Sequence, residues 1–235
     1  MNDSTIQSLN ELNHRFYQAF AKDFDDTRHA PWPGWLRLLP HLDAVKPETE
    51  VFQVTDVACG NGRFYKFLEK HWSKKFEYLG IDSCVGLLEK APQIDSVRFE
   101  ERDVLTQGLP ELECTFIGAF GFFHHIPSFE RRRKVVEEML AALQPGGVMA
   151  IAFWAFATSP RFESKTLEWP EELEREPGDY ILSWNRGGLG RRYCHYVDEA
   201  EENKLLQGLD ITIRERFFED GKSRDLNRYL IVQKN

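Results

Sequence analysis

From Glu50 onward, short apolar runs alternate with segments of helical periodicity, and this alternation limits the possible folds more than any other feature. The apolar runs cover residues 51–58, 76–81, 97–101, 116–120 and 148–154. Near-continuous apolar strands interleaved with helices are typical of a parallel sheet that is buried on both faces. The sequence therefore predicts an α/β fold with a Rossmann-like, mostly parallel sheet.

Two further apolar runs, residues 211–218 and 229–233, follow near the C-terminus. The short connection between them contains Asp220-Gly221, and an Asp-Gly pair favours a hairpin. We therefore expect a seven-stranded sheet with helices on both faces and an antiparallel last strand.

The length of the chain fits one domain, because 235 residues with 42% hydrophobic content can form a single α/β core. Apolar residues at helical spacing from Leu9 to Phe20 predict an amphipathic helix in the first two dozen residues. We expect one domain over residues 1–235, with a helical extension at residues 1–45. Residues 158–192 are longer than an ordinary loop and predict an insertion on the substrate side.

The four cysteines, Cys59, Cys84, Cys114 and Cys194, are widely spaced and form no C-x-x-C pair. This spacing argues against a disulfide framework and against a zinc site, so no metal is expected. The chain shows neither a secretory leader nor an apolar run long enough to cross a bilayer, which predicts a cytoplasmic protein. The net charge of −8 repels polyanions, so a nucleic-acid partner would need a local basic surface.

A glycine-containing segment follows the first predicted strand, at the position where open α/β sheets bind ligands. It reads Asp56-Val57-Ala58-Cys59-Gly60-Asn61-Gly62-Arg63, and its glycines allow the backbone to approach a cofactor closely. Asp82 ends the second strand, 22 positions after Gly60, where a carboxylate can accept hydrogen bonds from ribose hydroxyls. Asp103 follows the third strand at the same edge.

Each of these features also has a purely structural interpretation. The glycines are compatible with a simple turn, and Asp82 or Asp103 alone could cap a helix. Their ordered spacing favours a bound cofactor. A dinucleotide is disfavoured, because the Gly-x-Gly-x-x-Gly pattern would require glycine where Tyr65 stands.

Gln144-Pro145-Gly146-Gly147 leads into the fifth predicted strand. With this turn, the set of motifs over residues 51–154 resembles the class I S-adenosylmethionine-dependent methyltransferases. The resemblance implies S-adenosylmethionine as cofactor, S-adenosylhomocysteine as product and no metal. Ala58 departs from the pattern, since glycine is common there, and its methyl group would crowd the cofactor unless φ is negative. The predicted cofactor-binding residues are Asp56, Ala58, Gly60, Gly62, Arg63, Asp82, Ser83, Asp103, Val104 and Phe120.

The flanking segments resemble a narrower family, the tRNA wobble-uridine carboxymethyl methyltransferases, which esterify a carboxymethyl group on uracil. The stretches that carry this resemblance are TRHAPWP (27–33), HHIP (124–127) through Arg131-Arg132, FWA (153–155), GDYILSW (178–184), RYCHY (192–196) and RD (224–225). The sequence departs from the family at Cys194, where tyrosine is usual, and at Leu226, Arg228 and Tyr229.

Methylation of a carboxylate suits these residues, because the nucleophile is already ionised at neutral pH and needs orientation more than a general base. Cations and imidazoles can hold the oxygen that does not attack. The predicted catalytic residues are Arg28, His124, Arg192 and His195. The predicted substrate-binding residues are Trp32, His125, Trp154, Trp184 and Tyr193, of which the aromatic ones can stack on a base. Loop histidines that bind carbonyls and tryptophans in the core are the structural alternatives.

The resemblance further implies tRNA as a partner, and the eukaryotic members work with a small zinc-binding activator subunit. The run from Arg131 to Lys134 begins a predicted helix, where cations oppose the helix dipole, which hints at phosphate binding, although a solvated helix face is the commoner explanation. Two alternatives remain open: a methyltransferase for a small carboxylic acid or another metabolite, and a non-catalytic binding subunit with the same fold.

Overall fold

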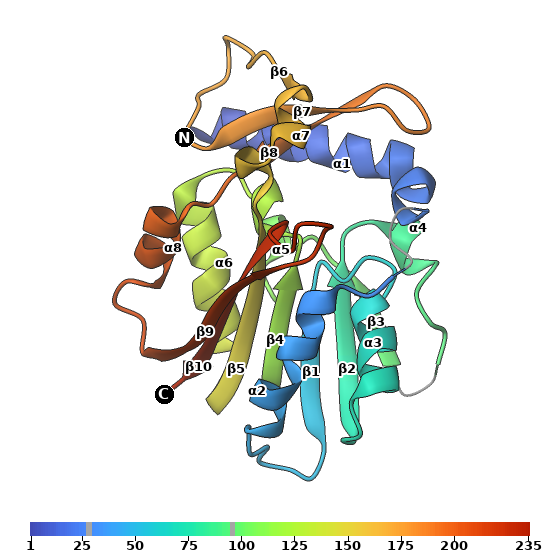
Figure 1. The fold of residues 1–235 in the computed structure, drawn as a ribbon, viewed down its shortest axis with the longest axis vertical. Coiled ribbons are helices and arrows are strands. Elements are labelled where there is room, and N and C mark those ends of the chain that lie inside the picture. Colours follow the sequence, from blue (N-terminus) through green and yellow to red (C-terminus); the bar gives the residue numbers. More distant parts are fainter. Residues whose placement is uncertain (27–29, 95–96) are drawn as a thin grey trace.

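The computed structural model describes residues 1–26, 30–94 and 97–235. Its main sheet has seven strands in the order β3-β2-β1-β4-β5-β10-β9 (Figure 1). The first five strands run parallel, and β10 pairs antiparallel with both β5 and β9. The predicted fold class is therefore confirmed. The strand bounds are Phe52–Val57 (β1), Phe76–Asp82 (β2), Val97–Glu101 (β3), Cys114–Phe120 (β4), Leu143–Trp154 (β5), Ile211–Glu219 (β9) and Asn227–Lys234 (β10).

The sheet is buried on both faces, as the near-continuous apolar strands predict. Phe116 and Ile117, adjacent on β4, point to opposite faces and belong to two different core clusters. One face packs on η1 (Pro33–Arg37), α2 (Leu39–Asp43) and α3 (Arg63–His71), and the other on α5 (Val104–Gln107), α6 (Phe129–Ala141) and α8 (Glu199–Leu206). Each large apolar side chain buried in this way contributes about 1.5–3 kcal/mol.

The predicted N-terminal helix is present as α1, Asp3–Asp25. It is capped by Asn2, whose side chain accepts a hydrogen bond from the Thr5 amide at 2.8 Å. Ile6, Leu9 and Phe16 form its buried side. Helix α1 lies across the carboxyl ends of the central strands, beside a second, smaller sheet (Figure 1). Among the described residues, no helix has the length and apolar character needed to cross a bilayer.

The segment predicted as one long insertion contains regular structure that the sequence did not reveal. It begins with η3 (Phe156–Thr158) and α7 (Pro160–Glu163), and three antiparallel strands follow: β6 (Thr166–Leu167), β7 (Asp179–Trp184) and β8 (Gly190–His195). Its small core includes Leu182 and Cys194, packed against Phe156 and Phe162. The strands were missed because short, charged segments give only a weak alternating pattern.

The hint of phosphate binding at the start of α6 is wrong for its two central arginines. Arg132 is only 1% exposed, and its guanidinium lies 2.9 Å from Glu176 and 2.6 Å from Glu201. Arg133 donates to the carbonyls of Lys204 and Leu205, at the C-terminal end of α8 where the helix dipole favours a cation. The guanidinium groups of Arg132 and Arg133 therefore bind other parts of the protein.

Candidate active site

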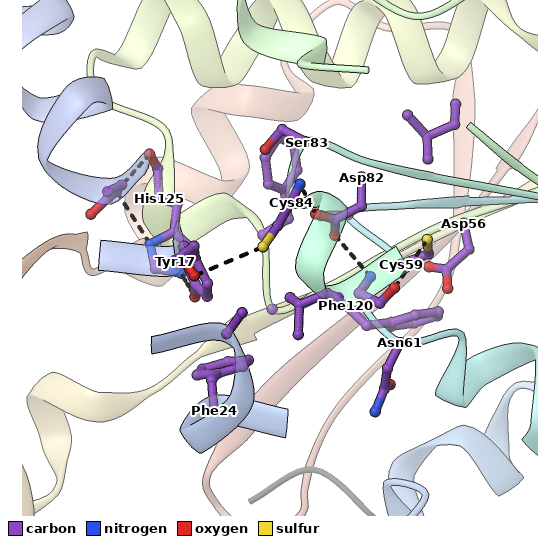
Figure 2. A pocket seen from close by; sticks show the side chains of 18 of the residues that line it. Tyr17, Phe24, Asp56, Cys59, Asn61, Asp82, Ser83, Cys84, Phe120 and His125 are labelled. Carbon is purple, nitrogen blue, oxygen red and sulfur yellow. Dashed lines mark hydrogen bonds between the residues drawn. The ribbon is translucent and has the colours of Figure 1, made fainter. Parts of the chain in front are cut away.

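A cavity of about 520 Å³ opens at the carboxyl ends of β1, β2 and β4, below α1 (Figure 2). The chain continues from β1 toward β2 on one side and places β4 on the other, so the strand order reverses between β1 and β4. Open α/β sheets bind their ligands at such a switch point. The volume is within the usual range of small-molecule sites.

The loop after β1 approaches the cavity through Gly60, which has a φ of 56°. A Cβ atom on Gly60 would meet nothing closer than Leu87 at 3.9 Å, so the space in front of this glycine is free of protein. Gly62 was also predicted to bind the cofactor, but it has a different position. It does not line the cavity, and a Cβ atom there would lie 2.8 Å from Phe99 and 2.9 Å from Pro92. Gly62 allows the loop to pack closely and to start α3 at a φ of 71°.

Ala58 lines the cavity with a φ of 58°, in the left-handed region. Ala58 therefore lacks the negative φ at which its methyl group was expected to leave room for the cofactor. A residue with a Cβ atom in this conformation costs about 1–2 kcal/mol, so the loop keeps a glycine-like backbone in spite of its side chain.

Asp82, at the end of β2, also lines the cavity. One carboxylate oxygen accepts from the Gly60 amide and the other from the Cys84 amide, both at 2.8 Å (Figure 2). Burial raises the pKa of Asp82, whereas the hydrogen bonds from the Cys84 and Gly60 amides lower it, with a net rise. Each oxygen retains a lone pair for a ligand hydroxyl. Ser83 lines the cavity beside it.

Asp103 and Val104 lie at the end of β3 and border the same cavity. Asp103 caps α5, accepting from the Leu105 amide at 3.0 Å and from the Thr106 hydroxyl at 2.9 Å. Asp103 therefore caps a helix and also borders the cavity.

Asp56 borders the cavity but is buried, and it accepts a hydrogen bond from the Tyr78 hydroxyl at 2.6 Å. Burial raises the pKa of Asp56 to about 7, against the lowering effect of the Tyr78 bond. Its position indicates a role in holding β1 to β2.

An aromatic wall closes one side of the cavity. It includes Phe120 and Trp32, and both rings pack on the buried Trp35. Arg63 donates to the Ala30 carbonyl at 3.0 Å, and its guanidinium lies 5.4 Å from the Trp32 ring centre. Arg63 thus fixes the segment before η1 against the loop after β1.

The cavity lining also includes the predicted Arg192, His124, His125 and Trp154, which we call the acceptor end. The Arg192 side chain is 6% exposed, and its guanidinium carbon lies 5.1 Å from the Trp154 ring centre. Among the described residues no carboxylate forms an ion pair with Arg192, and its buried Nε has no hydrogen-bond partner. A buried cation without an internal counter-ion indicates an anionic ligand.

Three of the predicted catalytic and substrate-binding residues lie outside the cavity. His195 is held between Asp179 and Glu201, at 2.7 Å from each, and the Tyr193 hydroxyl donates to Asp179 at 2.7 Å. Side chains alternate along β8, so Arg192 faces the cavity while Tyr193 and His195 point to the other face. The guanidinium carbon of Arg192 lies 5.7 Å from the Trp184 ring centre, but Trp184 does not line the cavity. Arg28, the fourth predicted catalytic residue, lies outside the described part of the chain.

The sequence analysis missed the contribution of α1 to the site. The Tyr17 hydroxyl lies 2.7 Å from His125 Nε2 (Figure 2). Asn13 contacts both His125 and the Tyr193 amide. Polar residues on the apolar side of a predicted helix were the available signal, since Asn13 falls between Leu9 and Phe16.

Comparison with known proteins agrees with this geometry. Residues 54–147 match the methyltransferase domain family. A putative methyltransferase of Encephalitozoon cuniculi is 31% identical over 77% of this chain and 78% of its own length. The chain belongs to the class I S-adenosylmethionine-dependent methyltransferases.

Two further relatives extend the comparison of this methyltransferase. The tRNA (carboxymethyluridine(34)-5-O)-methyltransferase of Schizosaccharomyces pombe is 27% identical over 98% of the chain and 99% of its own length. A solved S-adenosylmethionine-dependent methyltransferase from Methanosarcina mazei superposes with a TM-score of 0.63 at 16% identity, covering 87% of this chain and 98% of the other. The protein is therefore an enzyme with the expected fold.

Proposed function

We propose that this methyltransferase transfers a methyl group to an ionised carboxylate, the carboxymethyl group of a wobble uridine in tRNA. Arg192 carries the proposal, because it is a buried cation beside the cavity with no carboxylate partner among the described residues. The alignment with the Schizosaccharomyces pombe enzyme over nearly the whole of both chains supports the same acceptor.

The cavity residues suit S-adenosylmethionine, which supplies an electrophilic methyl group on a sulfonium. Asp82 would accept from the ribose hydroxyls, and the free space in front of Gly60 would admit the methionine portion. Asp103 and Val104 would contact the adenine end, with Ser83 beside the ribose and Phe120 on the aromatic wall. This arrangement leaves the Arg192 end of the cavity for the acceptor.

The chain has little acid–base chemistry to perform on such an acceptor. A carboxylate is already ionised at neutral pH, so binding it in line with the methyl group is the main requirement. Arg192 would hold the oxygen that does not attack, and His124, which also lines the cavity, would provide a second contact. The rings around this end, including Trp154, exclude water.

Stacking would supply the remaining specificity. Trp154 and Trp32 line the cavity, and base–aromatic stacking contributes about 1–3 kcal/mol per base in single-stranded recognition. His125 is held by Tyr17 next to this end and would contact the uracil from the side of α1.

We also propose that residues 1–235 form one methyltransferase domain, with residues 1–45 as a helical extension and residues 158–192 as an insertion on the substrate side. The contact of β8 with α1 and the entry of Arg192 into the cavity support this division. A cytoplasmic location fits a tRNA substrate. An activator subunit would need an apolar surface at a sheet edge, and the exposed Val85 and Ile94 lie beside the edge strand β3.

A small carboxylic acid is the second candidate acceptor. The net charge of −8 favours it, since a polyanion would be repelled by the mean field of the protein. Both candidates use the same Arg192 contact, so only the identity of the acceptor separates them.

The test is methyl transfer from labelled S-adenosylmethionine at low salt. The acceptors are tRNA bearing carboxymethyluridine, the same tRNA with unmodified uridine, and a mixture of small carboxylic acids. We expect base-labile label on the carboxymethylated tRNA alone, because only an ester is released by mild alkali. Label on the small acids and none on tRNA would establish the second candidate instead.

Two variants locate the acceptor contact. Arg192→Met keeps the apolar stem of the side chain and removes the charge, so turnover should fall roughly 10- to 100-fold, since hydrogen bonds to a charged group contribute about 1.5–3 kcal/mol. S-adenosylmethionine affinity should remain within a factor of about two, since Arg192 is not among the proposed cofactor contacts. Arg191→Met is the matched control, because Arg191 is the exposed neighbour on the same strand. Equal activity of both variants would reject the role of Arg192.

A further inference from the structure

Three metal-ligating side chains meet beside the acceptor end of the cavity. The ligand atoms of His124, His125 and Cys194 all lie within 4.8 Å of one another. The two histidines belong to η2 (Phe123–His125), which follows β4, whereas Cys194 comes from β8. Sequence spacing gave no sign of this group because Cys194 lies far along the chain from the two histidines.

We propose that His124, His125 and Cys194 form a binding site for a zinc(II)-class ion, with a fourth coordination position open toward the cavity. Imidazole nitrogen and thiolate sulfur are the donors that zinc prefers, and sites with three protein ligands keep one open position. In a tetrahedral zinc site whose Zn–N and Zn–S bonds have their ordinary lengths, the donor atoms lie ~3.3–3.8 Å apart. The observed spacing needs side-chain movements of only about 1 Å.

The surroundings of His125 suit a coordinated imidazole. Its Nε2 lies 2.7 Å from the Tyr17 hydroxyl, and its Nδ1 lies 3.3 Å from the Asn13 amide nitrogen and 3.4 Å from the Tyr193 carbonyl. Whichever nitrogen binds the ion, the other keeps a partner from α1 or β8. Such outer contacts orient a metal-bound histidine and strengthen the site.

Binding of the ion would release one proton from the protein. The ion displaces the thiol proton of Cys194, which passes to solvent, and the thiolate offsets one of the two positive charges. Arg192 lies two residues before Cys194, on the same side of β8, and its charge opposes the ion, which limits the affinity of the site. Because a thiol proton is released when the ion binds, affinity should increase with pH.

A second cluster of donors, Glu176, Asp179 and His195, does not support the same inference. Asp179 and Glu176 already bind Tyr193 and Arg132 at 2.7 and 2.9 Å. Occupation by an ion would break a buried network of ion pairs.

The test uses the full chain, freed of metal by a chelator and titrated with cobalt(II) chloride. We expect binding of one ion per chain, with a thiolate-to-cobalt charge-transfer band and visible bands of tetrahedral cobalt, all removed by zinc chloride. Cys194→Ser should abolish the charge-transfer band and weaken zinc binding at least about tenfold. Cys114→Ser is the matched control, because Cys114 is another buried thiol, donates to the Ala142 carbonyl and lies outside the three-residue group.

Folding of each variant is checked by its thermal unfolding and by S-adenosylmethionine binding. If Cys194→Ser does not fold, His124→Asn takes its place, and the tetrahedral bands should then be lost. Failure of the wild-type chain to take up cobalt or zinc, or an unchanged charge-transfer band in Cys194→Ser, would overturn the proposed site. With the ion bound, its open position would take the place of the acceptor contacts proposed for His124 and His125. The readouts do not involve methyl transfer, so they test the ion site separately from the proposed acceptor.

Discussion

The Asp82 carboxylate accepts a hydrogen bond from the Gly60 amide at 2.8 Å, and this contact joins the end of β2 to the glycine loop after β1. One side chain therefore both shapes the loop and faces the cavity. The two functions are coupled, because any ligand hydroxyl that binds Asp82 meets a carboxylate already fixed by two amides.

Asp82→Ala should lower the affinity for S-adenosylmethionine roughly 10- to 100-fold, since hydrogen bonds to a charged group contribute about 1.5–3 kcal/mol. Asp82→Asn retains one carbonyl acceptor and should show a smaller loss. Titration calorimetry measures both. Glu111→Ala is the control, because Glu111 is exposed just before β4, at the opposite end of the sheet. An unchanged affinity in Asp82→Ala would contradict the placement of the ribose.

Ala58→Gly should stabilise the protein by up to about 1 kcal/mol. The gain comes from relief of the left-handed strain at a φ of 58°, partly offset by the entropy that glycine loses on folding. Ala142→Gly, at a φ of −69°, lacks that strain and should destabilise by about 0.5–1 kcal/mol. Urea unfolding of the two variants gives the comparison, and a loss of equal size in both would show that Ala58 is not strained.

The buried His195 should make stability depend on pH. Burial opposes its protonation, but hydrogen bonds to Asp179 and Glu201 outweigh burial and raise the pKa of His195 above 6.5. The stabilisation is therefore fully present below pH 6.5 and is lost as the pH rises through the folded pKa. The difference in unfolding free energy between the wild type and His195→Asn should shrink over that range. The exposed His71→Asn should show no such trend.

Glu201 adds the opposite dependence at acid pH. Burial raises the pKa of Glu201, but its bonds with His195 and Arg132 outweigh burial, so the net pKa is below the usual 4.5. Its contribution is present above pH 4.5 and disappears as the pH falls through the lower folded value. Stability that rises steadily toward low pH would contradict this ion-pair network.

The sequence predicted the parallel sheet and its cavity because both depend on local signals. The strand ends at Val57 and Asp82 follow from apolar runs, and parallel strands bring their carboxyl ends to one edge. The placement of His195 and Tyr193 depends instead on the direction in which each side chain of β8 points. That direction is set by packing of β8 against α1 and β7, which no local pattern encodes.

Arg192 and His195 show the distinction most clearly. Both appear in one short motif and both are ionisable, yet only Arg192 enters the cavity. His195 instead satisfies Asp179 and Glu201 on the other face of β8. A one-residue change in the register of β8 would exchange these roles, and the sequence alone does not set that register.

Asn13 should control how firmly α1 holds the acceptor end of the cavity. Its side-chain oxygen accepts from the Tyr193 amide at 2.9 Å, and its amide nitrogen lies 3.3 Å from His125 Nδ1. Asn13→Ala leaves the buried Tyr193 amide without an acceptor, which should cost about 1–3 kcal/mol. Hydrogen exchange at the Tyr193 amide should accelerate, and the KM for the acceptor should rise more than that for S-adenosylmethionine.

Asn13→Asp separates the two contacts of this residue. It keeps the acceptor for the Tyr193 amide and so should preserve slow exchange there, but it replaces the donor to His125 with a carboxylate. Gln7→Ala, on the exposed side of the same helix, should change stability by less than about 0.5 kcal/mol. If Asn13→Ala leaves the exchange of the Tyr193 amide as slow as in the wild type, α1 is held by its apolar contacts with β8 and not by this side chain.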